Sequence, residues 1–509
     1  MKRRALVSVY NKEGIVDFAR ELVGLDYEIV STGGTYDLLA KEGIQVVNSN
    51  SITGFTQLLD GKVKTLHPKI HAGILADITN NKEVEELAKN EIEPFSLVVV
   101  NLYPFEETAK REDATIEDLI KDIDIGGITM IRAAAKNHKN VGIICDKNDY
   151  TPIISVLKAN NGELPLEQKR ALALKAFDTS SSYDRIICDT LSKFYEIEPP
   201  KNIKLTKIQD LRYGENPHQK AALYKQNDLI DYDILHGKEL SYNNITDVTA
   251  AVSIVAEFYD VPCVAIIKHG TPCGVALGSS IQDAYLKAFD CDPISAFGGI
   301  IALSQPVTLE IAKHAHSVFL EVIIAPDFTP EAFELLSKKK NIRLIKLNTP
   351  LKYFKSFLNE EIKVTPFGIL VQDADVQDLN KDDFKVVTKT KPTAEMIEDM
   401  VFAFKVVKHT KSNAIVIAKD FKAMGICAGQ TSRVDAVEIA VTRACDATKD
   451  AVLASDGFFP ATDNIDVAAQ ARIAGIIQPG GSIKDNDVIA ACDKYNIAMV
   501  TTGIRHFKH

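Results

Sequence analysis

Short apolar runs alternate with helical patterns through the first 150 residues, and this alternation limits the possible folds more than any other feature. The run 97–100 (Leu-Val-Val-Val) is continuously apolar, which is typical of a parallel strand buried on both faces. Residues 5–9, 27–30 and 141–145 form similar runs, and residues 14–23 carry apolar side chains at helical spacing. Repeated βα units predict an open parallel sheet covered by helices, which places the chain in the α/β class.

A helical pattern spans residues 166–195 and is followed by the charged, double-proline stretch 196–201. We interpret this stretch as a domain boundary, which divides the chain into residues 1–198 and 199–509.

The second part contains an internal echo. Segments 264–269 and 404–409 are apolar and both end in Lys-His, and each is followed by another apolar segment, a glycine-containing stretch and a helix. We interpret both segments as strands, and the echo as a sign of two related α/β lobes.

The composition excludes several classes of protein. With 59 Lys and Arg against 69 Asp and Glu, the formal charge is -10, whereas a non-specific nucleic-acid binder carries a basic excess. The eight cysteines include no CxxC pair, so neither a disulfide framework nor a structural zinc site is expected, and the reducing cytoplasm is the expected location. No apolar run approaches the roughly 18 residues that a membrane-spanning helix needs.

Two loops are candidates for holding a phosphate. Residues 8–12 follow the first predicted strand, and residues 31–35 (Ser-Thr-Gly-Gly-Thr) follow the second. Free N–H groups at a helix start favour an anion, and such loops meet at the carboxyl edge of a parallel sheet. The alternative is that both are ordinary helix caps. Neither matches a P-loop or a dinucleotide fingerprint.

The first part holds further candidates for chemistry. Lys62 and Lys64 face the same side of an extended segment, so they repel each other unless they are solvated or face an anion. Tyr103 follows the most apolar strand, and Asp124 lies between two isoleucines, where a buried carboxylate needs a partner or a raised pKa. Lys136 lies on a predicted helix, one turn after an arginine.

In the second part, Lys268 and His269 end a predicted strand. A buried structural histidine is the common alternative, but a neighbouring lysine favours a neutral imidazole, which suits proton transfer. Cys273 follows a proline, yet the HxE and PCxxC pattern of zinc deaminases is absent, so we interpret Cys273 as a packing residue.

Several longer motifs resemble one known family. The chain resembles the bifunctional AICAR transformylase/IMP cyclohydrolases of purine biosynthesis over essentially its whole length. The motifs that carry the resemblance are 64–68 (KTLHP), 101–105 (NLYPF), 124–127 (DIGG), 132–138 (RAAAKNH), 212–218 (RYGENPH), 268–269 (KH), 295–299 (SAFGG) and 428–433 (AGQTSR).

The resemblance implies a fold and a pair of reactions. Residues 1–198 would form a methylglyoxal-synthase-like domain that closes FAICAR to IMP with loss of water. Residues 199–509 would form two cytidine-deaminase-like lobes that transfer a formyl group from 10-formyltetrahydrofolate, the co-substrate, to AICAR. The family works without zinc as a homodimer whose transformylase sites lie at the subunit interface.

The resemblance also implies site residues, position by position. The catalytic positions of the cyclohydrolase are Lys64, Tyr103, Asp124 and Lys136, and the nucleotide-binding positions are Lys12, Thr32, Gly34, Thr35 and Lys62. The catalytic positions of the transformylase are Lys268 and His269, and its AICAR-contact positions are Arg212, Tyr213, Asn244, Phe297, Gly298, Glu321, Asn413, Arg433, Arg505 and Phe507. The folate wall is Ile294, Phe458, Pro460, Asp463 and Asn464. Lys62 and Glu321 stand where some members carry Arg and Asp.

Two other functions fit the residues without the resemblance. The first part alone resembles a methylglyoxal-synthase-type lyase, but that leaves the long second part unexplained. A non-catalytic nucleotide sensor needs phosphate loops, but it does not need the catalytic positions of both parts.

Overall fold

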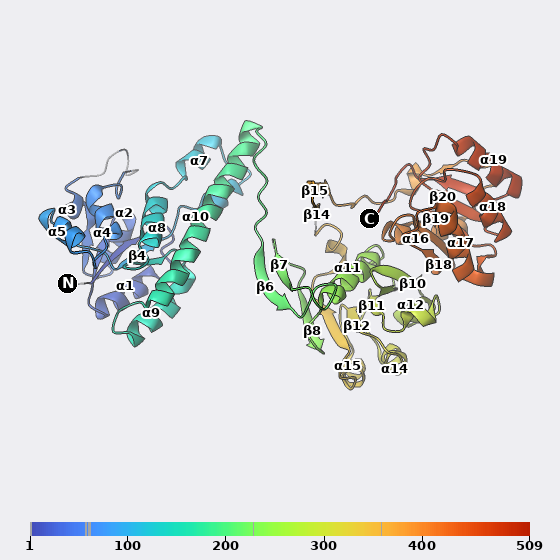
Figure 1. Cartoon of the computed structure of the whole chain (residues 1–509), viewed down its shortest axis with the longest axis horizontal. Helices are drawn as coiled ribbons and strands as arrows, with labels where there is room; N and C mark the ends of the chain where they lie inside the picture. Colours follow the sequence, from blue (N-terminus) through green and yellow to red (C-terminus); the bar gives the residue numbers. More distant parts are fainter. Residues whose placement is uncertain (1–2, 56–58, 60–62, 227–228, 358) are drawn as a thin grey trace. The chain divides into compact units, whose positions relative to one another are not determined.

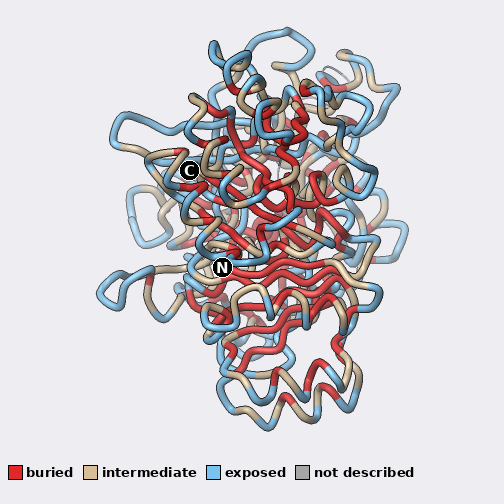
Figure 2. Tube along the Cα trace, turned by 90° about the vertical axis from the view of Figure 1, so that its right-hand side faces the viewer, coloured by how far each residue is buried: buried red, intermediate tan, exposed pale blue. Residues whose placement is uncertain are grey.

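The computed structural model describes residues 3–55, 59, 63–226, 229–357 and 359–509 (Figure 1). The chain divides into two compact units, Met1–Asn202 and Ile203–His509. Figure 2 shows the buried residues as continuous stretches in the interior, with the exposed residues in the outer loops and turns. Among the described residues, no helix is long and apolar enough to cross a membrane.

The first unit is built on a five-stranded parallel sheet with the order β3-β2-β1-β4-β5. Its strands are β1 (Arg3–Ser8), β2 (Tyr27–Ser31), β3 (Val46–Asn48), β4 (Leu97–Val100) and β5 (Gly142–Ile144). The four strands expected from apolar runs are therefore confirmed.

Helices cover this sheet, and those expected over residues 14–23 and 166–195 are confirmed. The helices are α1 (Ile15–Gly24), α2 (Gly33–Lys41), α3 (Ser49–Thr53), α4 (Pro68–Leu75), α5 (Asn81–Lys89), α6 (Phe105–Ala109), α7 (Ile116–Lys121), α8 (Gly126–Lys136), α9 (Tyr150–Ala159) and α10 (Leu166–Tyr195).

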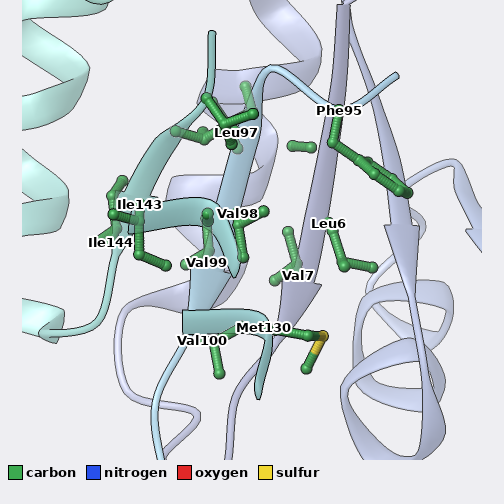
Figure 3. Close-up of a cluster of buried hydrophobic side chains, with 14 of the residues drawn as sticks. Leu6, Val7, Phe95, Leu97, Val98, Val99, Val100, Met130, Ile143 and Ile144 are labelled. Atoms are coloured by element: carbon green, nitrogen blue, oxygen red, sulfur yellow. The ribbon is translucent and has the colours of Figure 1, made fainter. Parts of the chain in front are cut away.

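Both faces of the central strands are buried. Leu6 and Val7 of β1 are fully buried although they point to opposite faces, and so are Val98 and Val99 of β4. Figure 3 shows these side chains in one cluster with Met130 of α8. Because burying such a side chain stabilises a fold by about 1.5–3 kcal/mol, this cluster stabilises the central strands of the sheet.

The second unit contains a mixed twelve-stranded sheet with the order β16-β21-β20-β19-β17-β18-β10-β9-β11-β12-β13-β8. Its strands are β8 (Tyr232–His236), β9 (Cys263–Lys268), β10 (Thr271–Leu277), β11 (Ile300–Leu303), β12 (Val322–Ala325), β13 (Arg343–Leu347), β16 (Lys385–Val386), β17 (Ile415–Lys419), β18 (Lys422–Cys427), β19 (Val452–Ser455), β20 (Gly475–Gln478) and β21 (Ala498–Thr501). Two separate hairpins are β6 (Thr206–Leu211) with β7 (Ala221–Lys225), and β14 (Glu360–Thr365) with β15 (Gly368–Asp373).

Helices flank this sheet. They are α11 (Tyr242–Ala256), α12 (Ile281–Phe289), α13 (Pro293–Ala296), α14 (Leu309–Ser317), α15 (Pro330–Ser337), α16 (Ala394–Lys408), α17 (Arg433–Ala444), α18 (Asp463–Gln470) and α19 (Asp485–Tyr495).

The sheet is duplicated about the β10–β18 pair. The first lobe (residues 242–347) runs from α11 to β13, and the second lobe (residues 394–501) runs from α16 to β21. In each lobe a helix leads into an antiparallel hairpin, and the first hairpin strand pairs with the first of three parallel strands. The chain therefore contains two lobes of the same topology, as expected from the internal echo.

The two segments that suggested the echo, 264–269 and 404–409, are nevertheless not equivalent in the fold. Segment 404–409 is not a strand, because α16 covers residues 394–408. Phe402, Phe404, Val406 and Val407 are buried on several sides of the helix, and no residue of the segment is exposed. A short apolar run of this kind cannot be assigned to helix or strand by periodicity. The position equivalent to Lys268 is Lys419, at the end of β17.

A buried ion cluster joins the lobes at equivalent positions. Glu257 follows α11 and His409 follows α16, and His409 Nε2 lies 3.1 Å from Glu257 Oε1. Lys355 and Lys408 also contact the Glu257 carboxylate, with Lys408 Nζ at 3.3 Å. Burial raises the pKa of Glu257, but the bond from His409 and the nearby lysines outweigh burial and lower it.

Replacing Glu257 with glutamine is expected to lower the free energy of unfolding by about 3–5 kcal/mol, because buried cations lose their counter-charge. A lowered carboxyl pKa stabilises the fold above the unfolded value of 4.5, and this contribution is lost as the pH falls through the lower folded value. Urea unfolding should therefore show a smaller gap between variant and wild type below pH 4.5. Glu398→Gln, which breaks an exposed pair with Lys381, should cost less than about 1 kcal/mol at any pH. Equal costs for the two variants would contradict the assignment.

Candidate functional sites

The two predicted phosphate loops of the first unit lie against each other. Thr35 Oγ1 accepts a hydrogen bond from the Val9 amide at 3.2 Å and donates one to the Val9 carbonyl at 2.9 Å. Thr32 precedes the first turn of α2, and Gly33 has a positive φ of 52°. The loops meet because β1 and β2 are adjacent and parallel.

Two ammonium groups converge on these loops. A methyl group on Gly33 would lie only 3.0 Å from Lys64 Nζ, so the lysine lies directly over the start of α2. Burial and the charge of Lys64 lower the pKa of Lys12, whose Nζ donates to the carbonyls of Val9 and Tyr10. Among the described residues, neither ammonium has a carboxylate in an ion pair. Two ammonium groups that lie close together at a helix N-terminus repel each other, and a bound anion would stabilise both.

Asp124 lies beneath the start of α8 and is only 9% exposed. Its carboxylate accepts hydrogen bonds from the amides of Gly127 at 2.6 Å and Tyr103 at 3.3 Å. A methyl group on Gly127 would lie 2.7 Å from the Asp124 carboxylate, so glycine is needed there. Burial raises the pKa of Asp124, and the two amides oppose that shift. The carboxylate therefore holds a proton more readily than an exposed one does.

The helix α10 supplies a residue that sequence analysis missed. The Tyr183 hydroxyl donates to the Asp122 carbonyl at 3.0 Å and accepts from the Asp124 amide at 2.9 Å, which ties down the loop that carries Asp124. Tyr103 is half-exposed, and burial followed by the charge of Asp124 raises its pKa. The contact of Tyr183 joins residues about 60 positions apart, so no local pattern signals it.

One expected cyclohydrolase residue, Lys136, lies away from this site. Lys136 is exposed at the last turn of α8, and helix geometry places it roughly 15 Å along the axis from Gly126. It therefore lies toward the opposite edge of the sheet from Asp124. Lys62 lies outside the described residues. Gly34 is in the first turn of α2, and a methyl group there would meet nothing within 4 Å.

In the first lobe, Lys268 and His269 lie at a tight hairpin turn. Lys268 ends β9 and pairs with Thr271 of β10, so His269 and Gly270 form the two-residue connection. His269 has a φ of 53° and Gly270 a φ of 71°. Lys268 Nζ donates to the Phe297 carbonyl at 2.5 Å.

Other expected contact residues of the first lobe surround this turn. The Gly298 amide donates to the Phe319 carbonyl at 2.8 Å, which holds the 297–298 segment beside Lys268. Glu321 Oε2 accepts a hydrogen bond from Asn244 Nδ2 at 2.9 Å, and Arg343 Nη1 lies 3.8 Å from the same oxygen. Arg343 is 9% exposed and was not predicted. Its Nε is buried without a hydrogen-bond partner.

A second cluster forms in the second lobe. The Arg433 guanidinium pairs with the fully buried Asp456, and Asp456 also accepts from the Ala414 amide at 3.0 Å. Asn413 Nδ2 donates to the Gln430 carbonyl at 2.9 Å. Asp456 was not predicted, because its partners lie 23 and 42 positions away.

The chain's C-terminal segment completes this cluster. A methyl group on Gly457 would lie 2.6 Å from the Phe507 ring and 2.7 Å from Arg433 Nη2, so both side chains pack over that glycine. The Arg505 guanidinium stacks 4.2 Å from the Phe507 ring centroid. Arg212 and Tyr213, which follow β6, stack on each other at 4.8 Å.

The expected folate-wall residues are placed less closely together. Ile294 of α13 is 88% exposed. Phe458 and Pro460 lie between β19 and α18, and Asp463 and Asn464 are the first two residues of α18. Asn464 is 1% exposed, and its Oδ1 is buried without a hydrogen-bond partner. Ile294 also lines a cavity of about 260 Å³ with Cys273, Met424 and Arg443.

Both clusters of the second unit lie at one edge of the twelve-stranded sheet. The strands β9, β18, β19 and β21 all run in the same direction, so their carboxyl ends share an edge. Lys268 ends β9, Asp456 follows β19, and Phe507 follows β21. Within the described part of the chain, no hydrogen bond or ion pair joins a side chain of one cluster to a side chain of the other.

Cys273 is a packing residue, as expected. It is 8% exposed, donates toward the Ile266 carbonyl at 3.5 Å, and burial raises its pKa to about 12. The described residues contain no group of three or more His, Cys, Asp or Glu placed to hold a metal.

Comparison with known proteins identifies the family. Residues 134–443 match the AICARFT/IMPCHase bienzyme, and residues 14–129 match the MGS-like domain. The bifunctional purine biosynthesis protein PurH of Acetivibrio thermocellus is 49% identical, with all of both chains covered. PurH proteins of Bacillus thuringiensis subsp. konkukian and Thermoanaerobacter sp. are 48% and 49% identical, again over both full lengths.

The chain is thus an α/β enzyme that begins with an MGS-like domain, and it belongs to the AICARFT/IMPCHase bienzyme family. This confirms the resemblance found in the sequence. The chain is a bifunctional enzyme of purine biosynthesis with formyltransferase and cyclohydrolase activities, and its family implies a folate co-substrate.

Proposed function

We propose that each unit carries one reaction. The part ending near residue 198 closes FAICAR to IMP, and the part beginning near residue 199 transfers the formyl group of 10-formyltetrahydrofolate to AICAR. The observation that carries this assignment is the separation of the candidate groups: Lys12, Lys64 and Asp124 belong to one compact unit, and Lys268, His269 and Arg433 belong to the other.

The proposed cyclisation begins when the carboxamide nitrogen of FAICAR attacks the formyl carbon. An amide nitrogen is a weak nucleophile, so the site must hold it near that carbon and stabilise the oxyanion that forms. Lys64 supplies positive charge to the oxyanion, while Lys12 and the loop around Thr35 hold the phosphate. Asp124 and Tyr103 move the protons that allow the oxygen to leave as water. The raised pKa values of Asp124 and Tyr103 support these proton-transfer roles.

The proposed formyl transfer joins the amine of AICAR to the formyl carbon and breaks the bond to N10 of the folate. His269 takes a proton from the attacking amine, and Lys268 steadies the oxyanion or returns a proton to the leaving nitrogen. AICAR is bound by residues of both lobes and of the segments that flank them: Arg212, Tyr213, Asn244, Phe297, Gly298, Glu321, Asn413, Arg433, Arg505 and Phe507. The folate side of the site is lined by Ile294, Phe458, Pro460, Asp463 and Asn464.

One assay tests the two reactions together. Purified protein given AICAR and 10-formyltetrahydrofolate should release tetrahydrofolate first, and the absorbance of IMP should then rise. A protein that binds AICAR but produces neither would be a nucleotide sensor, and the proposal would be wrong. We also propose that the enzyme works in the cytoplasm, which agrees with eight cysteines that are all free.

We propose that the enzyme is a homodimer with its transformylase sites at the subunit interface. The hairpin β14–β15 supports this proposal, because an isolated two-stranded hairpin is marginally stable in water. Its cross-strand pairs Ile362–Val371 and Val364–Ile369 place four aliphatic side chains on one face. Val364 is 78% exposed and Ile369 is 58% exposed, so a second copy of the chain would cover an apolar surface.

The double variant Val364→Lys with Ile369→Lys is expected to be a monomer in analytical ultracentrifugation. It should lose formyl transfer and keep cyclisation, since the cyclohydrolase groups lie within one unit. Ile483→Lys is the matched control, because Ile483 is fully exposed and lies outside the hairpin. This variant should sediment with the mass of the wild-type dimer. A fully active dimer of the double variant would overturn the assignment of this face.

A further inference from the structure

The same contact between a helix and a hairpin turn occurs in both lobes of the second unit. Asp247 is the sixth residue of α11, and Asp399 is the sixth residue of α16. Each helix has 15 residues and precedes the hairpin of its own lobe. The two aspartates therefore hold equivalent positions in the duplicated fold.

In the first lobe the carboxylate of Asp247 holds the turn that carries His269. Asp247 Oδ1 accepts a hydrogen bond from the Gly270 amide at 2.6 Å, and the His269 amide also donates to this carboxylate. Burial raises the pKa of Asp247, while the Gly270 amide and the charge of the His269 imidazole lower it. Glu321 is a further charged group that acts on the Asp247 carboxylate.

In the second lobe Asp399 makes the equivalent contacts. Its two carboxylate oxygens accept from the amides of Asp420 at 3.0 Å and Phe421 at 2.8 Å. These two residues connect β17 to β18, as His269 and Gly270 connect β9 to β10. Asp420 and Phe421 also have positive φ angles, of 51° and 57°.

This contact compensates for an unfavourable backbone conformation. A residue with a side chain rarely adopts a positive φ, because its Cβ crowds the following carbonyl. A carboxylate that accepts from both turn amides favours the turn over other conformations. In the second lobe that turn carries an aspartate and a phenylalanine, whereas in the first lobe it carries the proposed base His269.

We propose that Asp247 is a positioning residue for formyl transfer, because it holds the Lys268–His269 turn in the geometry that the reaction uses. The proposal rests on the proposed role of His269. The second lobe separates the two possible roles of such an aspartate, since Asp399 performs the structural role at a turn for which no catalytic role is proposed.

The test compares Asp247→Ala with Asp399→Ala in the full-length enzyme. Asp399 is 8% exposed, so its loss should lower the melting temperature, and Asp399→Ala should keep wild-type kcat for formyl transfer. Asp247→Ala should lower that kcat about ten- to hundredfold, since small misplacements of a catalytic group are costly. The KM for AICAR should change less than about twofold, because the residues proposed to bind AICAR remain. Cyclisation should be unchanged in both variants.

Two further variants complete the comparison. Asp247→Asn keeps an oxygen that accepts a hydrogen bond from a turn amide, so its kcat should lie between those of Asp247→Ala and the wild type. If Asp247→Ala folds poorly, Asp247→Asn replaces it in the comparison with Asp399→Ala. His269→Ala tests the underlying role: if it retains formyl transfer, the proposed function of His269 fails whatever Asp247 does. If His269→Ala is inactive while Asp247→Ala has wild-type kcat, or loses no more than Asp399→Ala, the positioning role of Asp247 is wrong.

Discussion

Replacing His269 with alanine is expected to abolish formyl transfer and to leave AICAR binding intact. The amine of AICAR attacks weakly because its lone pair is delocalised into the imidazole ring, so removal of its proton during attack matters for the rate. Losing a general base typically costs 10²- to 10⁴-fold in kcat. Binding should persist, because Arg433 lies in the second lobe, Phe507 lies in the segment after it, and neither depends on the imidazole. Calorimetry with AICAR and single-turnover release of tetrahydrofolate measure the two effects separately.

Two controls show whether this loss is specific. His316 is exposed on α14 of the same unit, so His316→Ala should behave as wild type. Cyclisation of added FAICAR should continue in His269→Ala, because the proposed cyclohydrolase groups belong to the first unit. Formyl transfer within a fewfold of wild type would eliminate His269 as the base.

The parallel sheet of the first unit was predictable because its strands are continuous apolar runs. Residues 97–100 are buried on both faces, and only a parallel strand covered by helices on both sides commonly reads this way. Segment 404–409 shows where the same reasoning fails. Its apolar side chains are equally buried, but they surround a helix, and tertiary packing decided between the two structures.

The candidate site shows the same division between local and tertiary signals. The carboxylate of Asp124 was predictable, because an acidic residue between isoleucines at a helix start is a local pattern. Tyr183 was not, since its contact with the Asp124 loop depends on how α10 packs. Asp247 and Asp456 were missed for the same reason: the groups they hold lie more than 20 positions away.

The duplicated lobes present different edges of the sheet to the candidate chemistry. The equivalent strands β9 and β17 run in opposite directions, so the turns at 269–270 and 420–421 lie at opposite edges. The cluster around Arg433 and Phe507 lies at the edge that holds Lys268. The second lobe therefore contributes through the end opposite to its own hairpin turn, which explains why its turn residues need not be reactive.

Replacing Lys64 with alanine is expected to lower kcat for cyclisation about 10²- to 10³-fold, the usual cost of removing one group that stabilises an oxyanion. Its ammonium lies over Gly33 and close enough to Lys12 to lower the pKa of that lysine. If Lys64 acts on the oxyanion, KM for FAICAR should change little, whereas a purely phosphate-binding role would raise KM at constant kcat. Removing Lys64 should also raise the pKa of Lys12, because a like charge is gone.

Lys41 supplies the matched control for this charge. It is exposed in the last turn of α2, the helix whose first residue lies beneath Lys64, so Lys41→Ala removes one positive charge roughly 12 Å further along the same helix. Long-range electrostatic attraction of the anionic substrate would weaken in both variants and would show as a salt-dependent change in kcat/KM. Only a local role predicts a loss of kcat confined to Lys64→Ala, and near wild-type turnover in that variant would exclude Lys64 from the chemistry.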